Sequence, residues 1–194
     1  MERIINLLQT LDRPGRDQVI DYLRTSNYAT ARCHTHHTYR GGLVDHALEV
    51  YELMREQRGD LSEESLIVCA LFHDLGKAAK RGWYLRGGHP SRSIQILDRC
   101  GFRLTAEERR SIGEHHPKVR RSIGEHHSKV RRSIGEHHSK ERTSFVCPLR
   151  RCLSTADMIS TGRWRVAHPR PDESPCKRLK NRLLLHLVEL SRRV

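Results

Sequence analysis

The 194-residue sequence predicts an all-α protein, and three observations support this fold class. Apolar residues recur at helical spacing in several segments, no stretch alternates apolar and polar residues as a strand would, and Gly or Pro separates the segments. Aromatic residues make up only 5% of the chain, so the core must consist mainly of Leu, Ile, Val and Ala. We therefore expect one helical bundle of ordinary domain size with irregular loops.

Apolar periodicity places the individual helices. The helix that matters most is expected over 66–75, because this run is apolar nearly all round and should be buried at the centre. Ser62 with the acidic residues after it resembles a capping box at its start, and His73 and Asp74 stand at its end, with Gly76 just beyond. The other helices are expected over 2–12, 16–24, 43–57, 90–100, 105–113, 149–160 and 177–193.

The charge balance of the chain is strongly basic. Lys and Arg outnumber Asp and Glu by 36 to 23, which gives a formal net charge of +13. A positive field of this size favours anionic partners such as nucleotides, nucleic acid or phosphorylated metabolites. The alternative is a solvated basic surface without a specific partner.

The six cysteines form no C-x-x-C pair, so a zinc ribbon is not expected. They are interpreted as core residues with free thiols, which suits a reducing cytoplasm. No secretory signal is recognisable, and no stretch reaches the roughly 20 apolar residues of a membrane span. We therefore expect a cytoplasmic protein that does not cross a membrane.

Three near-identical units of 11 residues occupy 109–141: RRSIGEHHPKV, RRSIGEHHSKV and RRSIGEHHSKE. Each unit has too few apolar residues to stack as a solenoid, so they are interpreted as a short segment expanded inside an ordinary domain. A period of 11 residues returns to nearly the same helix face, which allows an extended helix, but the Gly in each unit weakens it. A looped-out insertion is equally consistent with the pattern.

Metal-competent side chains occur at several separated places, each beside an apolar helical stretch. His73 and Asp74 are adjacent, and both can face one metal ion if the helix ends there. With His46 upstream and Asp157 downstream they supply two imidazoles and two carboxylates, a mixed set suited to transition metals. A His-Asp pair alone is common by chance, but four such ligands left without a metal would be costly buried polar groups.

Other histidines are open to two interpretations. His34, His36 and His37 flank the first candidate ligand and either line the mouth of the site or hydrogen-bond their own loop, and we favour the loop. His168 and His186 have no partner in a recognisable pattern and are expected to be structural.

Five motifs together resemble the HD-domain superfamily of metal-dependent phosphohydrolases. They are HHTYRGGLVDHALEV (36–50), LFHDLGK (71–77), GGHPSRSIQIL (87–97), LTAEERRSIGEHH (104–116) and PLRRCLSTADMIS (148–160). The resemblance implies an HD-type helical bundle over 34–160, carrying the repeats as an irregular or extended insertion. Residues 1–33 would then be N-terminal helices packed on the core, and 161–194 a basic C-terminal tail and helix.

The resemblance also implies the ligands. His46, His73, Asp74 and Asp157 match the first metal site, with Asp74 able to bridge two metals. His89 matches a ligand of a second metal, which a histidine at the end of the fourth helix would complete. His115, with His116, is our choice for it, and His126 and His137 in the later copies are rivals. The triplication departs from the family pattern.

The activity that the resemblance implies is hydrolysis of a phosphoester, with a nucleotide or a related phosphorylated compound as the expected substrate. The attacking water would be activated on one or two divalent metal ions (Mn, Fe, Zn, Co, Ni or Mg). Asp74 would orient the water, and Lys77, Arg81 and Arg92 would neutralise charge on the phosphate. Two alternatives remain open. One is a nucleic-acid-binding or accessory protein that keeps the HD fold with little catalysis, and the other is a poorly folding product of the repeat expansion.

Overall fold

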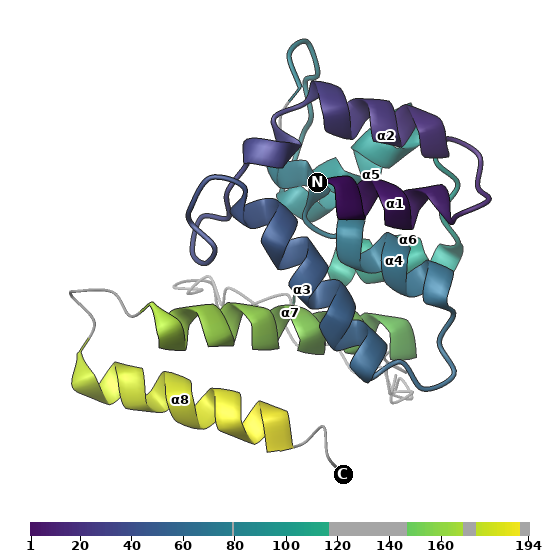
Figure 1. Ribbon diagram of the computed structural model, residues 1–194. Coiled ribbons are helices and arrows are strands. Elements are labelled where there is room, and N and C mark those ends of the chain that lie inside the picture. The colour runs from purple at the N-terminus through teal and green to yellow at the C-terminus, as the bar shows by residue number, and fades with distance from the viewer. Residues whose placement is uncertain (79, 117–146, 169–173, 191–194) are drawn as a thin grey trace, which may run out of the picture.

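The computed structural model describes residues 1–78, 80–116, 147–168 and 174–190, and all regular structure in them is helical (Figure 1). These residues form eight α-helices and two short 3-10 helices and contain no strand, which confirms the all-α prediction. The elements are α1 (Glu2–Gln9), α2 (Arg16–Thr25), η1 (Tyr28–Thr30), α3 (Gly42–Glu56), α4 (Glu63–Phe72), η2 (Leu75–Lys77), α5 (His89–Arg99), α6 (Ala106–Glu114), α7 (Pro148–Ala167) and α8 (Pro175–Leu190).

Helix α4 is the centre of the bundle, as its apolar composition predicts. All its residues from Leu66 to Phe72 are buried, and it packs against α1, α3, α6 and α7. Two details of the prediction were wrong. The helix ends at Phe72, so His73 and Asp74 lie in the turn beyond it, and Ser62 makes no side-chain capping bond. The capping box belongs instead to α6, where Thr105 and Glu108 cap each other.

Helices α3 and α7 cross against α4, and α8 lies alongside α7 on the side away from α4 (Figure 1). Helix α7 continues to Ala167, past the expected end at 160, so it crosses the predicted boundary between domain and tail. The lone Gly162 does not break it, because α8 packs there, with Leu185 in contact range of that glycine. None of the described helices combines the length and the apolar character that a membrane crossing requires.

The N-terminal helices are joined to the bundle by a buried ion pair. The Glu108 carboxylate, fully buried, accepts hydrogen bonds from Arg13 (2.7 Å), Ser65 (2.8 Å) and the Thr105 amide (2.9 Å). Burial alone would raise the pKa of Glu108, but the hydrogen bonds from Arg13 and its other donors outweigh burial and lower it. The pair therefore stabilises the fold as long as Glu108 is ionised.

Replacing Glu108 by Ala should lower the free energy of unfolding by about 3 kcal/mol, because the mostly buried Arg13 would keep only the half-exposed Glu64 as a partner, and Ser65 and the Thr105 amide would lose their acceptor. Asp98→Ala is the control, because its pair with Arg109 is about half exposed and should contribute less than about 1 kcal/mol. Denaturant unfolding at neutral pH measures both. The folded-state pKa of Glu108 is lowered, so its contribution is present above the ordinary carboxyl pKa and is lost as the pH falls through the lowered value. Equal effects of the two substitutions would contradict the assignment.

Candidate metal centre

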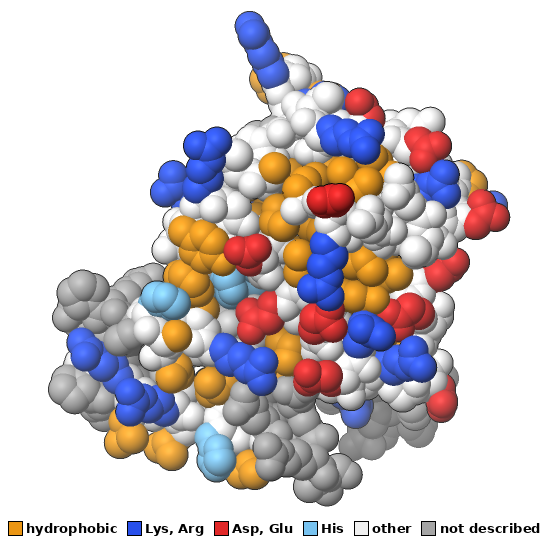
Figure 2. All heavy atoms as spheres, viewed as in Figure 1, with side chains coloured by type: hydrophobic (Ala, Val, Ile, Leu, Met, Phe, Trp, Pro, Cys, Tyr) orange, Lys and Arg blue, Asp and Glu red, His pale blue; other side chains and the backbone are white. Residues whose placement is uncertain are grey.

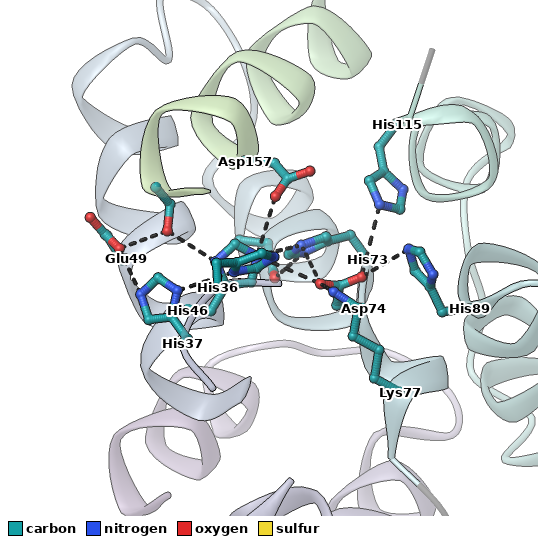
Figure 3. Close-up of polar contacts among 12 residues, drawn as sticks. His36, His37, His46, Glu49, His73, Asp74, Lys77, His89, His115 and Asp157 are labelled. Atoms are coloured by element: carbon teal, nitrogen blue, oxygen red, sulfur yellow. Dashed lines mark hydrogen bonds and ion pairs between the residues drawn. The ribbon is translucent and has the colours of Figure 1, made fainter. Parts of the chain in front are cut away.

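Five elements of the bundle direct polar side chains into one buried place (Figure 3). Helix α3, the turn after α4, and helices α5 and α7 each contribute, and the fifth contribution comes from the end of α6. The side chains that meet there are His46, His73, Asp74, His89, His115 and Asp157, all of which the sequence singled out as ligands. Except for His89, which is partly exposed, they are buried.

The break after α4 allows His73 and Asp74 to face the same point. Neighbouring side chains on a regular helix diverge by about 100°, because 3.6 residues complete a turn. Here His73 caps α4, and Asp74 leaves the helical conformation with φ of −108° and ψ of 8°. The His73 Nε2 and Asp74 Oδ2 atoms consequently lie 3.4 Å apart.

Four of these side chains form a first group around His46. Its Nε2 atom lies 3.2 Å from His73 Nε2, 3.3 Å from Asp157 Oδ1 and 3.6 Å from Asp74 Oδ2. Metal bonds of about 2.0–2.2 Å place neighbouring ligand atoms of a tetrahedral site about 3.3–3.6 Å apart. The ligand atoms of His46, His73 and Asp157 all lie close enough together to hold one metal ion, and Asp74 Oδ2 adjoins two of them, His46 and His73.

The second oxygen of Asp74 faces another group of histidines. Asp74 Oδ1 lies 3.1 Å from His89 Nε2 and 4.0 Å from His115 Nε2. His89 Nε2 in turn lies 2.9 Å from the Nε2 atom of His116, whose side chain is about half exposed. Asp74 therefore faces both groups at short distances, as a bridging ligand would, and Asp157 also reaches the second group, with its Oδ2 atom 3.8 Å from His116 Nδ1.

Two glycines make these approaches possible. A Cβ atom on Gly42, the first residue of α3, would stand 2.0 Å from the carbonyl oxygen of His37. A Cβ atom on Gly76 would stand 2.2 Å from the carbonyl oxygen of His89, at the start of α5. The first glycine thus lets α3 start against the His-rich loop, and the second lets the turn after α4 pack on α5.

Backbone carbonyls orient two of the imidazoles. The Nδ1 atom of His73 lies 2.9 Å from the Ala70 carbonyl, and that of His115 lies 2.7 Å from the Ile112 carbonyl. Since a carbonyl only accepts, both Nδ1 atoms carry hydrogen and donate it. The Nε2 atoms of His73 and His115 are therefore the ones that face the site, as in metal-binding histidines whose other nitrogen is hydrogen-bonded.

Electrostatics favour the protonation states that metal ligands need. Burial lowers the pKa of His46, of His115 to about 3 and of His89 to about 4, which keeps these imidazoles neutral. Burial would raise the pKa of Asp74, but the charges of His73 and Lys77 hold it well below its usual range. His73 differs, because the Asp74 carboxylate outweighs burial and raises the pKa of this imidazole. A site that attracts a proton in this way also suits a metal cation.

Two buried atoms of the cluster have no hydrogen-bond partner among the described residues. They are His115 Nε2 and Asp74 Oδ1, which face each other at 4.0 Å. An unpaired buried polar atom costs free energy, and coordination of a cation would satisfy it. The residues present therefore fit a metal centre by the type of their ligand atoms, the spacing of these atoms, their burial and the lack of other partners for two of them.

The other predicted site residues lie at different distances from the cluster. The Lys77 ammonium contacts the Asp74 carboxylate, and its side chain is mostly buried. Arg92 packs near Gly76, one turn after His89 in α5. Arg81 is exposed, and no contact ties it to the cluster in the described part of the chain. His126 and His137, the rivals of His115, lie outside the described residues.

The expectation that His36 and His37 serve only their loop was wrong. Both are buried, and their ring centroids lie 4.4 Å and 5.2 Å from that of His46. Sequence reasoning also missed Glu49 and Ser160, which contact each other and lie behind His46. A signal was present, since Glu49 lies three residues after His46 and Ser160 three residues after Asp157, on the same helix face in each case.

Four cysteines, at positions 33, 69, 100 and 152, are buried free thiols, as expected of core residues. Cys33 is more than a core residue, because its thiol lies within reach of His36 and Asp74. Burial raises the pKa of Cys33 to about 12, so the thiol stays protonated.

The fold and the site together define a class of protein: a helical bundle with a buried His/Asp metal centre. Residues 43–178 match the family model of the HD domain, well over half of the chain, and the protein belongs to this family. HD domains are typically metal-dependent phosphohydrolases, and the buried His/Asp cluster fits that class. Neither the curated proteins nor the solved structures contain a significant match to the chain.

We expect untagged protein to contain a divalent metal, and Asp74→Ala to lose it, because Asp74 faces both groups of histidines. The metal content should persist in Asp60→Ala, an exposed carboxylate between α3 and α4, and in a variant that lacks residues 120–141. Elemental analysis measures the content, and a rise in Tm on adding metal gives an independent reading. Metal that survives Asp74→Ala but disappears with residues 120–141 would assign binding to the repeated His pairs.

Proposed function

We propose that this HD-domain protein hydrolyses a phosphoester of a nucleotide or a related phosphorylated compound with the help of one or two divalent metal ions. The observation that carries the proposal is the convergence of His73, Asp74 and Asp157 on His46, whose Nε2 atom lies 3.2–3.6 Å from a nitrogen or oxygen of each. These four residues would hold the first ion. Asp74 would share a second ion with His89, His115 and His116.

When bound, a divalent metal supplies Lewis acidity, which activates water near neutral pH and polarises the phosphate. The chain's own residues would do the rest. Asp74 would orient the attacking water, since its carboxylate is ionised and lies between the two groups of histidines. Burial of the cluster would keep other water away and strengthen each electrostatic contact.

Cationic side chains near the cluster would bind the phosphate. Lys77 is the best placed, because its ammonium already touches the Asp74 carboxylate. Arg92 lies on the same side of α5 as His89, and its Nε atom is buried without a hydrogen-bond partner among the described residues. The proposal for Arg81 rests on the sequence alone.

Aromatic rings beside the metal centre support a nucleotide as the substrate. Tyr39 is 41% exposed, and its ring centroid lies 5.3 Å from that of Trp164. Trp164 stacks on His37 at 4.8 Å, and His37 adjoins His46 at 5.2 Å. A phosphate at the metals would therefore bring an attached nucleoside within reach of Tyr39.

The nucleic-acid-binding alternative rests on the net charge of +13. On the face drawn in Figure 2, however, Lys and Arg side chains are interspersed with Asp and Glu and do not form one basic patch. Binding through charge alone would be strongly salt-dependent and independent of Asp74. Such binding without turnover would favour the alternative over the hydrolase.

Lys77→Met should lower kcat for phosphoester hydrolysis by about 100-fold, because it removes a cation that would stabilise charge developing on the phosphate. Lys80→Met is the matched control, since its ammonium pairs with Asp21 and stacks near Trp83, away from the cluster. Steady-state kinetics with Mn²⁺ on a panel of nucleotides and simple phosphoesters measures both. Unchanged turnover in Lys77→Met would remove Lys77 from the proposal, and no turnover of any phosphoester by the wild type would remove the hydrolase itself.

Tyr39→Ala should raise KM for nucleotides by about tenfold, in line with roughly 1–3 kcal/mol for one base stacked on an aromatic ring. KM for p-nitrophenyl phosphate, which has no base, should change little. Tyr84→Ala is the control, since Tyr84 is 88% exposed in the loop before α5. An equal rise of KM for both kinds of substrate would show that Tyr39 does not contact a base.

A further inference from the structure

A chain of polar contacts lies behind His46, on the side away from the other ligands (Figure 3). The His46 Nδ1 atom lies 2.9 Å from the Ser160 hydroxyl, and this hydroxyl lies 2.6 Å from Glu49 Oε2. The same carboxylate oxygen lies 3.2 Å from His37 Nε2. Ser160 and Glu49 belong to none of the groups of potential metal ligands among the described residues, whereas His37 forms one with His36 and His46.

The number of protons in this chain fixes the direction of its hydrogen bonds. A hydroxyl has one proton to donate, and an ionised carboxylate can only accept. Ser160 therefore donates to Glu49 and must accept from His46, which places the imidazole hydrogen on Nδ1. The Nε2 atom of His46 is left with its lone pair directed at His73 and Asp157.

His46 needs this arrangement more than the other imidazoles do. The rings of His73 and His115 are oriented by carbonyl groups three residues earlier in the chain, which no side-chain substitution removes. His46 relies on a side-chain hydroxyl from α7, 114 residues away in sequence. Its tautomer therefore depends on two replaceable side chains.

The outer end of the chain is held rigidly. His37 is buried and adopts a left-handed backbone with φ of 45°, an uncommon conformation for a residue other than glycine. Its ring stacks on Trp164 of α7 at 4.8 Å with an interplanar angle of 27°. The glycine at position 42 admits the His37 carbonyl, as described above, so loop, α3 and α7 together fix the ring beside Glu49.

We propose that Ser160 and Glu49 are positioning residues that hold His46 in the tautomer with a free lone pair at Nε2, and that His37 holds Glu49 in place. The proposal rests on the proposed function in one respect, namely that His46 binds a metal ion. Residues of this kind in other metal sites change metal affinity by about 10- to 100-fold when removed.

Glu49→Gln gives the sharpest test. The amide of Gln can donate to Ser160, which lets the hydroxyl turn its proton toward His46 Nδ1 and favours the tautomer with hydrogen on Nε2. Ser160→Ala removes the acceptor and should leave a mixture of tautomers. Glu52→Gln, one turn further along α3 and paired with Arg3 and Arg55, is the control for the first variant. Ser111→Ala, a buried hydroxyl near Cys147, is the control for the second.

Two measurements on the full chain decide the outcome. Long-range ¹H–¹⁵N NMR of the metal-free protein, at a pH where His46 is neutral, should show its hydrogen on Nδ1 in the wild type and both controls, and on Nε2 in Glu49→Gln. Calorimetric titration with Co²⁺ should show about 10- to 100-fold weaker binding in Glu49→Gln and Ser160→Ala only. Thermal unfolding of the metal-free variants checks that they fold. If Ser160→Ala does not fold, Glu49→Gln alone tests the inference, because it is nearly isosteric with the wild type and its side chain is partly exposed.

The results separate this inference from the proposed function. If the wild type binds no Co²⁺ but the His46 tautomer still changes in Glu49→Gln, the metal centre is refuted and the proposed direction of the hydrogen bonds is supported. A wild type that binds Co²⁺, with the same His46 tautomer and affinity in Glu49→Gln as in Glu52→Gln, would overturn the inference and leave the proposed function intact.

Discussion

The structure depends on a carboxylate buried at the centre of a helical bundle. Asp74 lies at the point where the most apolar helix of the chain ends, and an ionised group in that place must be surrounded by cations or donors. Imidazoles on two sides and the Lys77 ammonium meet this need. The packing of α3, α5 and α7 around the turn can be understood as the arrangement that brings those partners to Asp74.

Helix α7 links the separate parts of the cluster through one face. Ser154, Asp157 and Ser160 follow one another at intervals of three residues, and each contacts a histidine of the cluster. Ser154 donates to the His115 carbonyl at 2.7 Å, Asp157 lies 3.3 Å from His46 Nε2, and Ser160 adjoins His46 Nδ1. A single helix thereby contacts histidines from two other helices, α3 and the end of α6.

The helices could be predicted from sequence because their signals are local, and the candidate ligands were implied by the motifs that resemble the HD domain. Apolar periodicity marks each helix, and the pairing of ligand residues with glycines in GGLVDH and HDLG marks the close approaches. The contacts behind His46 could not be predicted in this way. They join residues that are separated by 111 and 114 positions in the sequence, and no motif near Ser160 or Glu49 indicates which residue each contacts. The end of α4 was placed three residues too late, at Leu75 instead of Phe72, because no helix-breaking residue stands at 73 or 74 to mark it.

The junction between α6 and α7 has a consequence for the repeated segment. Arg150 binds both the backbone and the carboxylate of Glu114, and Ser154 donates to the carbonyl of His115, so the part of the first copy that ends α6 is held against α7. His115 is already in place when the second copy begins at residue 120. The two copies that follow residue 119 could thus be absent from the chain while every candidate ligand of the cluster is still present in it.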